Sequence, residues 1–236
     1  MLRFATTTSA LAFSAALCLP GLTAGPAQAQ SLFDTDVLEV SVLPGWREAG
    51  HRHVAAIRLT LEPGWKTYWR APGDAGIPPH FDWSASDNVV SVKPHWPVPE
   101  IFVQNGMRSV GYEREVIIPL SIERADPSRQ ITLSGEMQIG VCEEICIPAM
   151  VQITATLPAQ GSSDRVISSA LADRPMTEEE ARVSKVTCSV SPIEDGLELT
   201  VRATMPRLSK SEEAVIETAD PSVWVAEPRV TRDGRQ

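Results

Sequence analysis

Two cysteines, Cys142 and Cys146, lie four positions apart between stretches of strand-like sequence. On one extended strand they would be about 13 Å apart, because a strand rises about 3.3 Å per residue. A disulfide needs Cα atoms within about 4.4–6.8 Å of each other, so a bridged pair requires a turn between them. Glu143, Glu144 and Pro148 favour such a turn, since all three are poor strand residues. The sequence therefore predicts a strand that enters a short turn carrying both cysteines and a strand that leaves it.

Short runs of alternating apolar and polar residues recur along the chain between turn signals. Strands are predicted over residues 37–42, 53–61, 66–70, 81–83, 89–92, 115–122, 130–139 and 151–157. Pro119 indicates an edge strand or a bulge, because proline cannot donate a ladder hydrogen bond. The 19 prolines and 14 glycines suit many short strands rather than long helices. We therefore expect an all-β fold, an antiparallel β-sandwich over residues 30–160.

Residues 94–111 are predicted to form a long irregular segment. Loops longer than about 12 residues inside compact domains tend to be functional or disordered. Trp96, Ile101 and Phe102 argue against disorder here, because a disordered loop seldom holds such apolar side chains. We expect this segment to pack over another part of the protein.

The composition changes after residue 158, where a short helical linker is predicted over residues 161–184. Apolar residues recur at helical spacing between Asp164 and Asp173, and Thr177 with Glu180 forms a capping box for a second short helix. Residues 185–191 and 196–204 are predicted strands joined by a turn at Asp195-Gly196. Further strands are expected at 214–217 and 223–226. An Asp-Gly turn signal at 233–234 has no strand after it, so residues 185–236 are expected to form a partial second β unit.

The first 29 residues are predicted to be a cleavable signal peptide. Arg3 is their only charge, an apolar run follows at residues 10–22, and Ala27-Gln28-Ala29 has the small residues of a cleavage site. The run is shorter than the ~20 residues of a membrane span, which disfavours a retained anchor. We therefore expect a periplasmic protein whose mature chain is not inserted in a membrane.

Removal of the signal peptide would also remove Cys18 and leave three cysteines. Cysteine pairs persist in the oxidising periplasm, and an odd number leaves one thiol over. Cys188 lies in an alternating segment and is expected to be a small buried apolar residue of a strand.

The overall composition narrows the possible partners. A hydrophobic content of 43% is that of a globular protein. The net charge of -9 disfavours nucleic acid and anionic membrane surfaces as partners. The sequence has no Ser-His-Asp order, no phosphate-binding glycine loop and no zinc-ligand spacing, so no cofactor is expected.

Three stretches together resemble the periplasmic N-terminal domain of the disulfide reductase DsbD. They are the cysteine turn, residues 64–70 with 73–76 (GWKTYWR and GDAG), and the strand at residues 115–122. They look closest to the variants in the copper-tolerance protein ScsB and in related alphaproteobacterial proteins. The resemblance covers roughly residues 35–160 and extends into 185–228.

The resemblance implies an immunoglobulin-like sandwich whose cysteine pair alternates between disulfide and dithiol. In that family the pair takes electrons from a membrane-embedded thiol reductase of the DsbD or CcdA kind and passes them to periplasmic thioredoxin-fold proteins. Cys142 and Cys146 match the pair, and Phe102 is the candidate for the loop residue that caps it. The better-known members space their cysteines more widely. This sequence has no transmembrane segment after its periplasmic part and no thioredoxin-like C-x-x-C motif, so we expect at most one component of a protein-disulfide reductase.

A redox role also gives a meaning to the residues around the pair. Glu143 and Glu144 would raise the pKa of nearby thiols, because negative charge disfavours the thiolate. The pair would then react slowly until a partner supplied the attacking thiolate, and Phe102 would add steric protection. Equally, the glutamates can be solvated turn residues and Phe102 an ordinary core residue.

Two other functions are compatible with these residues. One is an interaction sandwich with an inert disulfide, although a bridge closing so small a loop adds little stability. The other is Cu(I) binding, since soft sulfur ligands select Cu(I). The sulfur ligands would be Met137, Cys142, Cys146 and Met150, and further ligands could come from His51, His53, His80 and His95.

Overall fold

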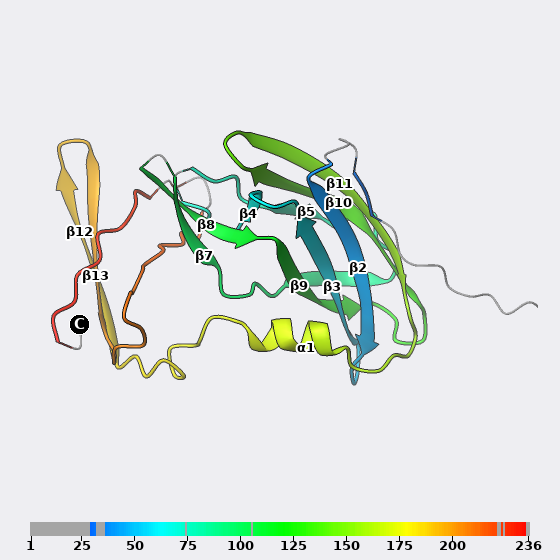
Figure 1. Ribbon diagram of the computed structural model, residues 1–236. Helices are drawn as coiled ribbons and strands as arrows, with labels where there is room; N and C mark the ends of the chain where they lie inside the picture. The colour runs from blue at the N-terminus through cyan, green and yellow to red at the C-terminus, as the bar shows by residue number, and fades with distance from the viewer. Residues whose placement is uncertain are drawn as a thin grey trace, which may run out of the picture.

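The computed structural model describes residues 29–31, 36–73, 75–104, 106–220, 223 and 225–234. Two antiparallel sheets pack face to face, and a separate two-stranded hairpin lies to one side of them (Figure 1). The all-β, immunoglobulin-like sandwich expected from the sequence is confirmed. The predicted signal peptide falls on residues that are not described, apart from the backbone of Ala29, which lies in β1 opposite Ile153 of β11.

The smaller sheet of the sandwich has four strands. In spatial order they are β2 (Leu38–Arg47), β3 (Arg52–Leu61), β9 (Glu115–Arg124) and β6 (Val89–Pro94). The larger sheet runs in the order β1 (Ala29–Ser31), β11 (Cys146–Leu157), β10 (Ile131–Cys142), β4 (Lys66–Tyr68), β8 (Met107–Glu113) and β7 (Glu100–Gln104). A short strand, β5 (His80–Asp82), pairs with β10 farther from the cysteines.

The core lies between the two sheets. In β10, burial alternates from residue to residue over its first half, so Ile131, Leu133 and Met137 all point inward. Ile57 of β3 and Leu120 of β9 face them from the smaller sheet and are fully buried. Since a strand in a one-sided sheet alternates in this way, the sequence pattern was sufficient to predict most of these strands.

The α-helix α1 (Arg165–Ala172) covers the outer face of the smaller sheet (Figure 1). The carboxylate of Asp164 caps it by accepting hydrogen bonds from the backbone N–H groups of Val166 and Ile167. The Ile167 side chain is fully buried against Val54 and Ala56 of β3. The helix therefore explains why β3 is apolar on both faces.

The second predicted helix is wrong, although its capping box forms. The N–H of Thr177 donates to Glu180 Oε2 at 2.8 Å, and the N–H of Glu180 donates to Thr177 Oγ1 at 3.2 Å. The chain makes a single turn there and then reaches Arg182 at φ +54°, which ends any helix.

Residues 94–111 are not the irregular segment that we expected, because most of them form the β7–β8 hairpin. Burial of β8 hides the strand pattern, since five consecutive residues of β8 are buried and both of its faces are therefore covered. The buried residues include Arg108, Ser109 and Gly111, so β8 has neither the alternation nor the apolar run by which a strand is recognised from sequence.

The expectation that Pro119 marks an edge or a bulge is also wrong. β9 lies between β3 and β6, and its ladder with β3 continues through the pair Ala56–Pro119. The Pro119 carbonyl accepts a hydrogen bond from the N–H of His95 at 2.7 Å, just beyond the last β6–β9 pair. Because the N and O atoms of a strand residue point to the same side, the missing N–H falls where the ladder with β6 has already ended.

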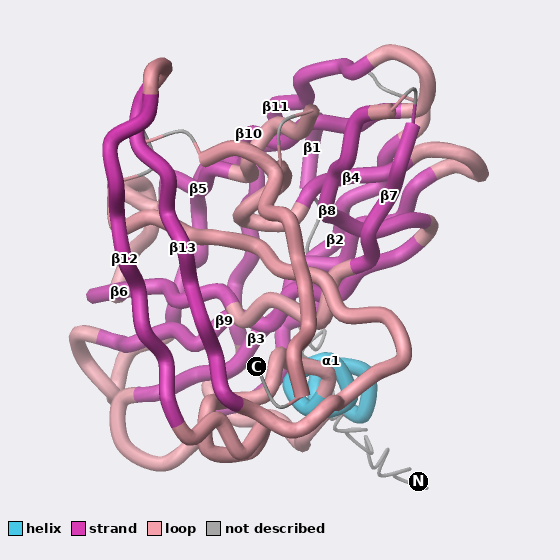
Figure 2. The backbone as a smooth tube through the Cα atoms, turned by 90° about the vertical axis from the view of Figure 1, so that its left-hand side faces the viewer, coloured by secondary structure: helices cyan, strands magenta, loops and turns pink. Residues whose placement is uncertain are grey.

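The strands β12 (Lys185–Ile193) and β13 (Gly196–Thr204) form the predicted hairpin, which stands apart from the sandwich in Figure 1 and lies in front of it in the view of Figure 2. Cys188 is a free cysteine and is exposed, so its expected burial is wrong. It lies on an apolar face of the hairpin, opposite Val201, and that face is exposed within the described part of the chain. Residues 214–217 form no strand, and none is seen at the described positions of 223–226.

Candidate redox site

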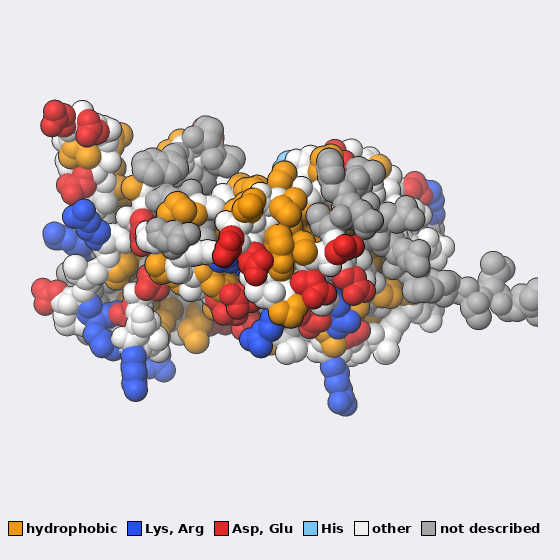
Figure 3. Space-filling model, turned by 45° about the horizontal axis from the view of Figure 1, so that its top comes forward, with side chains coloured by type: hydrophobic (Ala, Val, Ile, Leu, Met, Phe, Trp, Pro, Cys, Tyr) orange, Lys and Arg blue, Asp and Glu red, His pale blue; other side chains and the backbone are white. Residues whose placement is uncertain are grey.

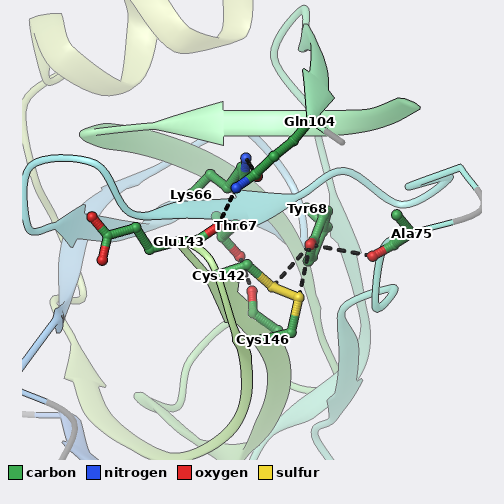
Figure 4. Close-up of a disulfide and its surroundings, with 9 residues drawn as sticks. Lys66, Thr67, Tyr68, Ala75, Gln104, Cys142, Glu143 and Cys146 are labelled. Atoms are coloured by element: carbon green, nitrogen blue, oxygen red, sulfur yellow. Dashed lines mark hydrogen bonds between the residues drawn. A yellow bond between two sulfur atoms is a disulfide. The ribbon is translucent and has the colours of Figure 1, made fainter. Parts of the chain in front are cut away.

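The two cysteines lie at the tip of the longest hairpin in the larger sheet. β10 and β11 pair in register over their whole length, and the last pair is Cys142 with Cys146. Glu143, Glu144 and Ile145 make the turn, and the two Sγ atoms form a disulfide with the Cα atoms 4.1 Å apart (Figure 4). The predicted arrangement of strand, turn and strand is therefore confirmed.

The two sulfur-bearing residues differ strongly in exposure. Cys142 is only 1% exposed, because it pairs with Lys66 of β4 and its sulfur lies against the Tyr68 hydroxyl. Cys146 is exposed, and its neighbour Ile145 has 75% of its surface exposed. An approaching thiolate can therefore reach the Cys146 side of the bridge more readily than the Cys142 side.

Tyr68 of β4 is the side chain in hydrogen-bond contact with both sulfurs. Its hydroxyl lies 2.8 Å from Cys142 Sγ, 3.3 Å from Cys146 Sγ and 3.3 Å from the carbonyl oxygen of Ala75 (Figure 4). The ring is buried, and this burial raises the pKa of the Tyr68 phenol. The phenol therefore stays protonated near neutral pH and can donate a hydrogen bond to sulfur.

Strand pairing holds Tyr68 in this position. Thr67 and Lys66 of β4 pair with Val141 and Cys142 of β10. The Thr67 hydroxyl also donates to the carbonyl of Gly140 at 2.9 Å. Tyr68 was not predicted to lie at this site; the available signal was its place in the GWKTYWR stretch that carries the family resemblance.

Phe102, the predicted cap, is half-buried on β7. Its ring centroid lies 5.4 Å from Nζ of Lys66. The structure therefore places Phe102 beside the strand that carries Tyr68, while Tyr68 itself contacts the sulfurs. A capping role for Phe102 stays a prediction.

The two glutamates of the turn are both exposed. The Glu143 carboxylate lies close to the backbone of Gly64, since a Cβ atom on that glycine would come within 2.9 Å of Glu143 Oε1. The backbone carbonyl of Glu143 accepts a hydrogen bond from Nε2 of Gln104 at 3.0 Å. An influence of the glutamates on the thiols stays a prediction.

The proposed copper ligands are not assembled around the bridge. Met137 points into the core, whereas Cys142 and Cys146 lie on the opposite face of the same hairpin. Met150 is four residues beyond Cys146 on β11, which corresponds to roughly 13 Å along a strand. The rings of His51, His53 and His95 are hydrogen-bonded to the Arg124 carbonyl, the Pro44 carbonyl and the Ser121 hydroxyl. His80 pairs with Gln138, four residues before Cys142 on β10. Within the described residues, no three His, Cys, Asp or Glu side chains form a group able to hold a metal.

The face of the molecule in Figure 3 carries many acidic side chains, in line with the net charge of -9. On the face shown in Figure 3, acidic and apolar side chains share the middle of the view, and basic side chains lie mainly at its margins. Across the described ranges, no helix combines the length and apolar character that a membrane crossing needs.

Comparison with known proteins agrees with this geometry. The family model for the N-terminal domain of the thiol:disulfide interchange protein DsbD matches residues 37–158. Among solved structures, the chain is similar to the N-terminal periplasmic domain of ScsB from Proteus mirabilis, with 21% sequence identity and a TM-score of 0.53. That match covers 79% of this chain and 89% of the other. A comparison with curated proteins finds no match.

The family match spans the sandwich from β2 to β11 and includes both bridged cysteines. The close Cys142–Cys146 pair supports the chemistry for which the family is named. The chain therefore belongs to the family of DsbD N-terminal domains and carries a thiol–disulfide exchange domain.

Proposed function

We propose that the Cys142–Cys146 pair is redox-active in the periplasm and passes electrons between two protein partners. The donor is a membrane-embedded thiol reductase, and the acceptors are periplasmic thioredoxin-fold proteins. The observation that carries this proposal is the asymmetric disulfide at the hairpin tip, with Cys146 exposed and Cys142 buried under Tyr68. The identity of both partners and the location rest on family membership.

The exposure difference supports a different role for each cysteine in this proposal. During reduction, a donor thiolate attacks Cys146 Sγ and forms a mixed disulfide, and Cys142 leaves as a thiolate. A second donor thiolate then attacks the donor's own sulfur in the mixed disulfide and releases Cys146 as a thiolate. The donor is oxidised to a disulfide, and the pair here gains two electrons and, on protonation, two protons.

The reverse sequence transfers these electrons to an acceptor. The Cys146 thiolate attacks the acceptor disulfide and displaces one acceptor thiolate. Cys142 then attacks Cys146 Sγ, which releases the reduced acceptor and restores the bridge. Cys146 is therefore the residue that bonds to partners, and Cys142 is the residue that resolves the mixed disulfide.

Tyr68 supports the chemistry of the buried sulfur. When Cys142 leaves as a thiolate, the Tyr68 hydroxyl at 2.8 Å can donate a hydrogen bond to the negative charge. A hydrogen bond to the charged form favours that form and lowers the pKa of the thiol. The same contact makes Cys142 a better leaving group, since a thiol of lower pKa leaves faster.

A trapping experiment in the periplasm tests the proposal. In a Cys188→Ser background, Cys142→Ser keeps the exposed Cys146 but removes the residue that resolves the mixed disulfide. We expect covalent complexes with thioredoxin-fold proteins that disappear under reducing conditions. The matched variant, Cys146→Ser, should form far fewer covalent complexes with partner proteins, because its remaining cysteine, Cys142, is buried. Equal trapping by both variants would contradict the assigned roles, and absence of reducible complexes from both would contradict the function.

A further inference from the structure

The β7–β8 hairpin reaches the cysteine turn through one side chain, Gln104, the last residue of β7. Both ends of its amide are used. Gln104 Oε1 accepts a hydrogen bond from Nζ of Lys66 at 2.6 Å, and Gln104 Nε2 donates to the backbone carbonyl of Glu143 at 3.0 Å. Figure 4 shows the three residues together on one side of the disulfide, with Tyr68 on the other. This chain of contacts joins β4, β7 and the turn.

Lys66 occupies a central position in these contacts. It is the direct cross-strand partner of Cys142 on β10 and of Glu113 on β8. Side chains opposite each other across an antiparallel pair start about 4.5–5.5 Å apart at Cβ. The Lys66 ammonium is also 5.4 Å from the ring centroid of Phe102. A hydrogen bond to Gln104 and the Phe102 ring thus hold the ammonium in place, while the backbone of Lys66 pairs with the buried cysteine.

The Gln104 contact reaches only the first half of the turn, and the Ile145 carbonyl in the second half accepts a longer bond, at 3.3 Å, from the N–H of Glu143. Glu143 directly follows Cys142, so the bond to its carbonyl restrains the half that carries the buried sulfur. The other half carries Ile145, which is 75% exposed, and the exposed Cys146. When the bridge opens, movement of the turn is therefore easier on the Cys146 side.

We propose that Lys66 and Gln104 form a polar latch that holds Cys142 in place while Cys146 moves with its partner. Both are positioning residues. The latch keeps the Cys142 sulfur close to Cys146 Sγ, and so favours attack on the mixed disulfide and release of the partner. A positive charge on the cross-strand partner of Cys142 also favours the Cys142 thiolate, which is the attacking form. This inference rests on the proposed function and specifies how the same site is controlled.

Glutathione can probe the latch without an identified partner. The glutathione thiolate attacks Cys146 Sγ, which gives a protein–glutathione mixed disulfide and the Cys142 thiolate. Attack of that thiolate on Cys146 Sγ expels glutathione and closes the bridge again. In a fixed glutathione buffer, the ratio of the mixed disulfide to the closed bridge, measured by mass spectrometry, therefore reports how well Cys142 is positioned.

Two variants in a Cys188→Ser background separate the two parts of the latch. Gln104→Ala should raise the ratio of mixed disulfide to closed bridge by roughly three- to tenfold, the effect of losing about one hydrogen bond. The control Gln138→Ala removes an exposed glutamine of β10 that bonds Glu136, and it should leave the ratio unchanged.

Lys66→Met should shift the pH profile of ring closure to higher pH, because the Cys142 thiolate loses the positive charge of its cross-strand partner. The control Lys93→Met removes a lysine of β6 in the smaller sheet and should leave the pH profile unchanged.

The outcomes distinguish this inference from the proposed function. If the parent protein exchanges with glutathione but Gln104→Ala has the same ratio and Lys66→Met has the same pH profile, the latch is refuted and the function stands. If the folded parent protein never forms the mixed disulfide or the dithiol, the proposed function itself fails. Amide hydrogen exchange of residues 142–146 gives a second readout, because loss of the latch should speed exchange there even in the oxidised protein.

Discussion

Replacing Tyr68 with phenylalanine removes one hydroxyl and leaves the buried ring in place. That hydroxyl lies 2.8 Å from Cys142 Sγ, and the pKa of the phenol is raised by burial, so it acts as a donor. A hydrogen bond to a charged group contributes about 1.5–3 kcal/mol. Since one pKa unit corresponds to about 1.36 kcal/mol, Tyr68→Phe should raise the pKa of the Cys142 thiol by roughly 1–2 units.

The same substitution should slow opening of the bridge. Cys142 is the leaving group when Cys146 is attacked, and thiols of higher pKa leave more slowly. With a Brønsted coefficient of about 0.5, a change of 1–2 units corresponds to a rate roughly 3–10 times lower. Two measurements check this: the pH dependence of thiolate absorbance in Cys146→Ser,Cys188→Ser protein, and the rate of bridge reduction by dithiothreitol in Cys188→Ser protein.

Tyr112 offers a matched control for this experiment. It is a buried tyrosine on β8, and its hydroxyl donates to the carbonyl of Pro97 at 2.8 Å and not to sulfur. Tyr112→Phe should cost about 1 kcal/mol of stability and leave the thiol pKa unchanged. The reasoning is refuted if Tyr68→Phe leaves both the thiol pKa and the reduction rate at their wild-type values, or if Tyr112→Phe changes them equally.

Two further predictions concern the stability of the sandwich. Burial lowers the pKa of His53 and of His95 below the usual value near 6.5, so the unfolded chain binds more protons as the pH falls below that value. The stability contribution of these neutral rings is therefore complete above pH ~6.5 and is lost on acidification; NMR titration showing that both rings protonate above ~6.5 in the folded protein would contradict this. Asn88 has φ +61°, and its side-chain NH₂ group donates to three backbone carbonyls. Asn88→Ala should cost roughly 3 kcal/mol and Asn88→Gly about 1 kcal/mol less, measured by urea unfolding; an alanine variant within about 0.5 kcal/mol of wild type would contradict the role of this residue.

The sequence predicted secondary structure best where one face of a strand or helix is buried and the opposite face is exposed to solvent. The strands β2, β10 and β11 follow an apolar and polar alternation that is visible in the sequence, and α1 begins at the capping residue Asp164. The turn between the cysteines followed from distance, because four residues of straight strand cannot join two sulfurs, and from the poor strand residues Glu143, Glu144 and Pro148.

The parts that were missed depend on contacts between distant segments. β8 is covered on both faces, so it lacks the alternation that identifies a strand. Tyr68 meets sulfur atoms more than 70 residues later because β4 pairs with the end of β10. The unequal burial of Cys142 and Cys146 arises in the same way, since neighbouring strands and loops cover only one of them.

The central claim is that the bridge opens and closes in the folded protein. The most direct test equilibrates Cys188→Ser protein in glutathione buffers of increasing reducing strength, then traps free thiols with a maleimide and counts them by mass, while circular dichroism reports the fold. We predict a reversible change from no free thiol to two free thiols, with the β-sheet spectrum unchanged throughout. Cysteines that react with the maleimide only after the sandwich has unfolded would show that the disulfide is inert and would contradict the account.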